Sequence, residues 1–75
     1  MRKSLTVAAS AVLPGDWLVV VERVSARRTR VVTHKVRAVR QTSRSVVIET
    51  AAFSTWKHPR EGVAIERLGE DTRAR

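Results

Sequence analysis

Valine dominates the apolar residues of this sequence, and this constrains the fold more than any other feature. β-branched side chains suit the pleated, half-buried surface of a sheet and are mildly disfavoured in helices. The 75 residues suffice for one domain, which at this length buries only about 60% of the surface that the unfolded chain exposes. Because the chain has no cysteine, neither a disulfide nor a structural zinc site can add stability. Apolar packing must supply it, with association as a supplement.

Alternation of apolar and polar residues predicts a series of short strands separated by turn signals. We expect strands over 5–7, 17–24, 30–41, 45–51 and 63–68. The turns between them are predicted at 14–16, 25–29 and 42–44, with a helical turn or irregular connection over 8–13 and a long loop over 52–62. A helix over 62–73 is the alternative for the last strand. Residues 1–69 would form one β-barrel domain, followed by a flexible, charged tail over 70–75.

Strand pairing can be tested by asking which register puts the apolar residues on one face. We expect Val24 opposite Val31 in the first hairpin, and Ala38 opposite Ile48 in the second. The second register also pairs Arg37 with Glu49. The predicted inner face then contains Trp17, Val19, Val21, His34, Val36, Ala38, Ile48, Val63 and Ile65, with Trp17 closing one end of the core.

Closure into a small barrel would remove the exposed edges of so short a sheet. The expected architecture is therefore all-β: a small five-stranded SH3-like barrel or a strongly curled antiparallel sheet. An OB-like barrel also fits, but the short loops favour the SH3-like form.

The formal net charge is +8, and twelve of the fifteen cations are arginine. Such a field attracts polyanions, and arginine binds phosphate bidentately and stacks on bases. Nucleic acid, DNA or RNA, is the first partner that this composition predicts. The alternative interpretation is a solvated surface that only keeps the protein soluble.

The sequence contains no complete set of catalytic residues. We therefore expect a binding module that is not an enzyme and has no cofactor or metal. The carboxylates are scattered, and no Gly-rich phosphate loop or nucleophile elbow is present. Ser54 and His58 lie four residues apart, but no third group orients the histidine.

The segment from Trp56 to Arg60 contains an aromatic ring among cations on a predicted loop, which is typical of a platform for single-stranded nucleic acid. A protein-interaction anchor and a lid over the barrel are the other interpretations of Trp56. The turns of the two hairpins would lie roughly 30 Å apart along the connecting strand, at 3.3 Å per residue. Cations on that strand could join them into a stripe. The predicted nucleic-acid-binding residues are Arg27, Arg28, Arg30, Lys35, Arg37, Arg44, Trp56, Lys57 and Arg60.

A protein-interaction module is the competing hypothesis. An acidic host protein could bind the Trp56 loop and an exposed strand edge, and the same edge could support a homo-oligomer. The longest apolar run, residues 17–21, is far too short to span a membrane, and no signal peptide is visible. We therefore expect a cytoplasmic protein with no membrane partner.

The stretch over 7–20, with its Ala-Ser turn, its Pro14-Gly15-Asp16 turn and the apolar strand that follows, resembles an element of hedgehog/intein-type and other compact barrels. The small Arg- and Val-rich chain as a whole is similar to proteins of actinobacterial phages. The resemblance covers about a fifth of the chain and implies a phage-type protein with an SH3-like barrel that acts in the host cytoplasm. No catalytic residue can be carried over from it.

Overall fold

The computed structural model describes residues 2–68, which form an antiparallel sheet of six strands. The elements in chain order are β1 (Arg2–Ala8), the 3-10 turn η1 (Ala9–Ala11), β2 (Trp17–Ser25), β3 (Arg28–Gln41), β4 (Val46–Thr50), β5 (Ser54–Lys57) and β6 (Gly62–Leu68). The all-β prediction is thus confirmed, and the strand predicted over 63–68 is present in place of the alternative helix. The flexible tail predicted over 70–75 lies outside the described residues.

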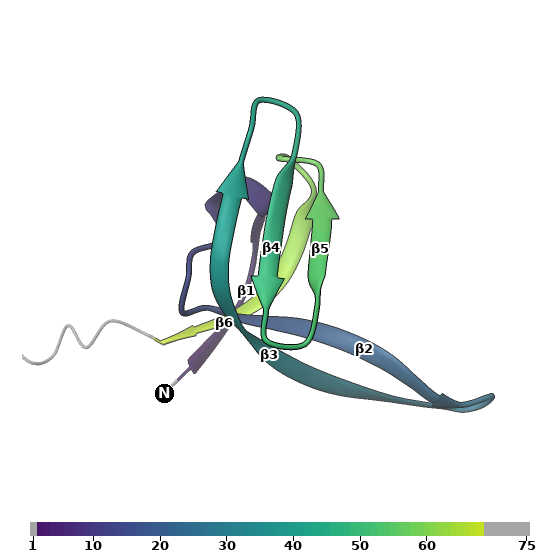
Figure 1. The fold of residues 1–75 in the computed structure, drawn as a ribbon. Helices are drawn as coiled ribbons and strands as arrows, with labels where there is room; N and C mark the ends of the chain where they lie inside the picture. Colours follow the sequence, from purple (N-terminus) through teal and green to yellow (C-terminus); the bar gives the residue numbers. More distant parts are fainter. Residues whose placement is uncertain (1, 69–75) are drawn as a thin grey trace, which may run out of the picture.

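The spatial order of the strands is β1-β6-β2-β3-β4-β5. β3 is the longest strand, and it bends as it passes from pairing with β2 to pairing with β4 (Figure 1). Within residues 2–68, no pairing joins the outer strands β1 and β5, so the sheet is open. The predicted five-stranded SH3-like barrel or strongly curled sheet is therefore wrong in both strand number and closure.

β5 is the strand that sequence patterning missed, because it lies inside the predicted long loop over 52–62. Its residues alternate between exposed and half-buried, as strand residues should. The half-buried positions are Thr55 and Lys57, which are not apolar, so the hydrophobic alternation that indicates a strand is absent here.

A β-bulge in β3 changes which residues face the core. Val36 pairs with Thr50, but Ala38 pairs with Glu49, which leaves Arg37 as the extra, exposed residue. Even-numbered residues of β3 therefore face inward before the bulge, and the odd-numbered Val39, opposite the buried Ile48, faces inward after it.

The second hairpin accordingly differs from its predicted register. Ala38 lies opposite Glu49, not Ile48, because the turn holds four residues, 42–45, where three were expected. The predicted Arg37–Glu49 pair does not form. Glu49 instead forms an ion pair with Arg40, whose Nη2 lies 2.6 Å from Glu49 Oε2.

The first hairpin is shifted by three residues from its prediction, since Val31 pairs with Val21 and not with Val24. An odd shift exchanges the two faces of β2. Leu18 is consequently buried, whereas Val21 is 64% exposed and Trp17 lies half-buried on the outer face. His34 is half-buried on the inner side, with its ring edge-to-face with Phe53 at 5.0 Å.

The core is one cluster of buried apolar side chains contributed by β2, β3, β4, β6 and the segment around η1. Its members are Ala9, Val12, Leu18, Val36, Val46, Ile48, Val63 and Ile65. Four of these residues were predicted to face inward: Val36, Ile48, Val63 and Ile65. The remaining predicted members are half-buried or exposed.

Candidate nucleic-acid interface

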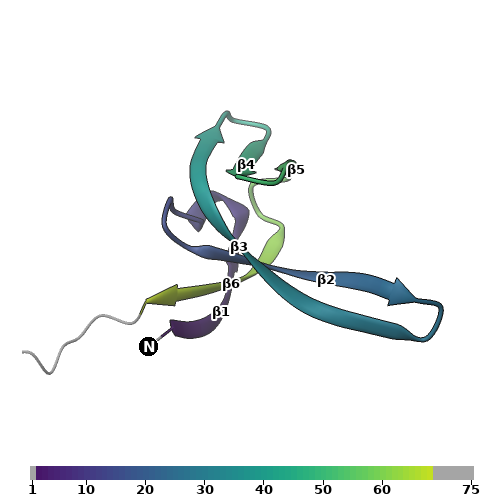
Figure 2. The same cartoon turned by 60° about the horizontal axis from the view of Figure 1, so that its bottom comes forward.

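Beyond Val21 and Val31, the hairpin of β2 and β3 leaves the body of the protein as a free two-stranded ribbon. We call residues 21–31 the arm. Figures 1 and 2 show it extending away from the other strands in both views. Every side chain over 23–31 is exposed, and the turn at its tip contains Arg27. The arm therefore presents two hydrogen-bonded strands that pack on nothing else in the described part of the chain.

The arm is strongly cationic. It contains four arginines and one glutamate, a net charge of +3. Glu22 Oε1 accepts a hydrogen bond from Arg30 Nε at 3.1 Å and also lies 3.1 Å from Nη2, and this ion pair neutralises one of the four arginines. The other three, Arg23, Arg27 and Arg28, make no ion pair with any residue in 2–68. Three guanidinium groups are thus free to meet an anion.

The two faces of the arm differ in chemistry. One face pairs Val21 with Val31 and Arg23 with Thr29 across the strands, and both valines are 64% exposed. The opposite face pairs Glu22 with Arg30. The first face therefore combines the apolar surface of the two valines with the free cation of Arg23. The sequence prediction did not include Arg23 among the binding residues. Its place on a strand between Glu22 and Val24 gave no signal beyond its charge.

A second group of cations lies on the outer face of the body, around Trp17. Arg2 lies 4.4 Å and Lys35 5.5 Å from the centre of this ring, on which both make cation–π contacts. Arg2 also pairs with Glu66 at 3.5 Å. Lys35 was predicted to contact nucleic acid, and here it is held beside the ring near the base of the arm, where it remains exposed.

The other predicted cations are dispersed. Arg37 is exposed at the bulge of β3, Arg44 lies in the loop between β3 and β4, and Arg60 lies in the loop between β5 and β6. Both of these loops lie at the end of the molecule opposite the arm (Figure 1). The structure therefore does not bring the nine predicted residues onto one surface.

Trp56 and Lys57 are also separated from the arm, because they belong to β5. Trp56 is 62% exposed, as a platform for a base requires. Lys57 occupies the opposite face of the strand and pairs with Glu61 at 3.4 Å. Because the two side chains lie on opposite faces, Trp56 cannot stack on a base while Lys57 contacts the neighbouring phosphate, as the sequence predicted.

Comparisons of the chain with family models, curated proteins and solved structures give no match. The resemblance to phage-type proteins consequently remains a prediction. Over the described strands and turns, no helix is long and apolar enough to cross a membrane. The same part of the chain contains no group of three or more His, Cys, Asp or Glu residues able to hold a metal ion.

Proposed function

We propose that this protein binds duplex DNA by inserting the arm into the major groove. The observation that carries the proposal is the arm itself, an exposed two-stranded ribbon with three arginines that make no ion pair within residues 2–68. The major groove is about 12 Å wide and admits such a ribbon. The strand from Val21 to Ser25 is about 16 Å long at 3.3 Å per residue, long enough to lie within the groove.

The side chains of the arm suit both the polar and the apolar contacts that a protein makes in the major groove. Arg27 and Arg28 at the tip, together with Arg23, would bind phosphates or base edges, since arginine forms paired hydrogen bonds with both. The exposed Val21 and Val31 would contact apolar groups such as thymine methyls. Lys35, on the same face of β3 four residues beyond Val31, adds a further cation.

The shape of the arm favours duplex DNA over RNA. The major groove of A-form RNA is deep and too narrow for side chains to read, so an inserted ribbon would be excluded. Single-stranded binding needs exposed aromatic rings beside the cations. The arm itself has no aromatic residue, and Trp56 belongs to a different strand. The ring of Trp17 is half-buried against Arg2 and Lys35.

The test is a salt titration of binding to a 20-base-pair duplex, followed by fluorescence anisotropy. The plot of the logarithm of the binding constant against the logarithm of the salt concentration has a negative slope. In the double variant Arg27→Gln/Arg28→Gln this slope should be less steep by about 2, because each lost phosphate contact removes about 0.9. The matched control, Arg44→Gln/Arg60→Gln, removes the same charge from the opposite end and should change the slope by less than about half as much. Equal losses in the two variants, or a wild-type affinity that does not vary with salt, would contradict the proposal.

A further inference from the structure

The free edge of β5 carries a second candidate interface, independent of the arm. Among the strands that the structure describes, β5 pairs with β4 alone and ends the sheet on that side. The N–H of Thr50 donates to the carbonyl of Phe53 at 2.8 Å, which sets the phase of the ladder. Because hydrogen-bonded pairs alternate along antiparallel strands, Ser54 and Trp56 direct their N–H and C=O groups away from β4. These groups are a template for one more strand.

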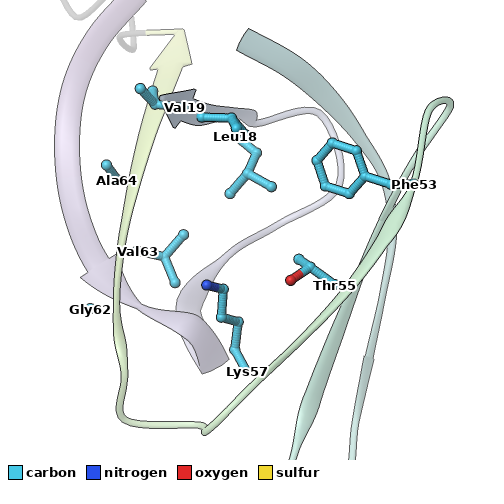
Figure 3. A pocket seen from close by; sticks show the side chains of 9 residues that line it. Leu18, Val19, Phe53, Thr55, Lys57, Gly62, Val63 and Ala64 are labelled. Atoms are coloured by element: carbon cyan, nitrogen blue, oxygen red, sulfur yellow. The ribbon is translucent and has the colours of Figure 1, made fainter. Parts of the chain in front are cut away.

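A pocket of about 280 Å³ lies on the inner side of this edge, between β5 and the strands β2 and β6. Figure 3 shows Leu18, Val63 and Phe53 around it, with Thr55 and the ammonium of Lys57 also directed into the space. The pocket thus combines an apolar wall with one cation and one hydroxyl. An apolar side chain fits the wall, and a carboxylate fits the cation.

The position of Lys57 determines which kind of strand this edge accepts. Its Nζ lies 3.4 Å from Glu61 Oε2, a partly exposed and elongated pair that a competing carboxylate can replace at little cost. A cation at a free edge repels another cationic strand, and a second copy of this chain carries the same +8. Charge complementarity therefore selects an acidic occupant over self-association.

We propose that β5 binds an extended segment of an acidic protein as an added antiparallel strand. Side chains of the segment that are two residues apart would face the pocket, one apolar against Leu18 and Phe53 and one carboxylate beside Lys57. The main-chain groups of Ser54 and Trp56 supply affinity, and the pocket supplies selectivity. This partner is distinct from the nucleic acid that the arm is proposed to bind.

The probe is the capped heptapeptide Ser-Asp-Thr-Val-Thr-Asp-Ser, which has the same sequence in both directions and places Asp, Val and Asp on one face. It is titrated into isotope-labelled full-length protein and followed by the NMR shifts of backbone amides. We expect the largest changes at Ser54 and Trp56, and no saturable change with the peptide in which both Asp are Lys. Shifts elsewhere, or none at about millimolar peptide, a concentration that detects even a weak Kd, overturn the proposal.

Two variants divide the contact into its parts. Ser54→Pro removes an outward N–H without touching the pairing with β4, and Lys57→Gln removes the cation; each should weaken binding about tenfold, or 1.4 kcal/mol. Lys35→Gln is the charge-matched control and should bind the peptide as the wild type does. Equal weakening by Lys57→Gln and Lys35→Gln would show that only the net charge of the protein matters, and would contradict a specific site at β5.

Self-association at the same edge is the competing outcome. A dimer seen by sedimentation and abolished by Ser54→Pro would assign the edge to a second copy and overturn the acidic partner. The Arg27→Gln/Arg28→Gln variant should retain peptide binding, so a failure of DNA binding and a failure of peptide binding can be distinguished.

Discussion

Arg67 on β6 holds the buried carboxylate of Asp16 through two hydrogen bonds of 2.8 Å, one from Nε and one from Nη2. Asp16 also accepts the N–H of Leu13 at 2.9 Å, so one carboxylate closes the turn before β2 and ties it to β6. Gly15 makes this turn feasible, since its φ of 97° is one that other residues rarely adopt. The hydrogen bonds from Arg67 are the main reason that the pKa of Asp16 lies below its ordinary value of 3.8.

This lowered pKa predicts a pH dependence with a definite sign. The unfolded chain binds the proton more tightly than the folded protein, so the ionised carboxylate stabilises the fold above pH 3.8. That contribution is lost as the pH falls from 3.8 through the lower pKa of the folded state. The difference in stability between the wild type and Asp16→Asn, measured by urea unfolding, should therefore be largest at pH 7 and shrink as the pH falls below 3.8. A difference that stays constant with pH would contradict the assignment.

Removal of the guanidinium tests the same pair from the other side. Arg67→Met leaves a buried carboxylate with only the Leu13 N–H as partner, and we expect a loss of about 1–3 kcal/mol in the free energy of unfolding at pH 7. Arg44→Met, at an exposed loop position, is the control and should change stability by less than about 0.5 kcal/mol. Equal effects of the two substitutions would indicate that the pair contributes nothing.

The register of the first hairpin gives a second stability test. Leu18→Ala should cost about 2–5 kcal/mol, because its side chain is buried in the core. Val21→Ala, three residues along the same strand, should cost less than about 1 kcal/mol, because it loses only a cross-strand contact with Val31. The register predicted from sequence gives the reverse order, so thermal or urea unfolding of the two variants separates them.

That failed register shows where sequence patterning stops. Apolar alternation located the strands near 17–24 and 63–68, because each has a face that contacts the core. It assigned Val21 to the inside through the expected Val24–Val31 pairing, because a valine carries no sign of where the core ends. The bulge at Arg37 exchanges the faces of β3 in mid-strand, and no residue type there announces it. The candidate site depended on the strand register in the same way. The arginines could be identified by residue type, but nothing in the sequence indicated that the hairpin extends away from the body as an arm.

The arm should be dispensable for folding. Glu22 and Arg30 are directly paired, so replacing residues 23–29 with Asn-Gly would close a two-residue turn at that pair. This short-arm variant removes no buried residue, and we expect its stability to stay within about 1 kcal/mol of the wild type. Its affinity for the 20-base-pair duplex should fall to the level of nonspecific background. A variant that unfolds would show instead that the arm supports the body.

Trp56 provides the last prediction, because its role differs between the two nucleic acids. Its ring is exposed and belongs to β5, a strand that is not part of the arm, so duplex binding by the arm should not involve it. We expect Trp56→Ala to change affinity for the 20-base-pair duplex by less than about twofold, since stacking on an aromatic ring, worth about 1–3 kcal/mol per base, requires an unpaired base. Anisotropy titrations with the duplex and with a single strand of the same sequence make the comparison. A tenfold loss on the duplex would place the DNA across β5 and would contradict insertion of the arm as the mode of binding.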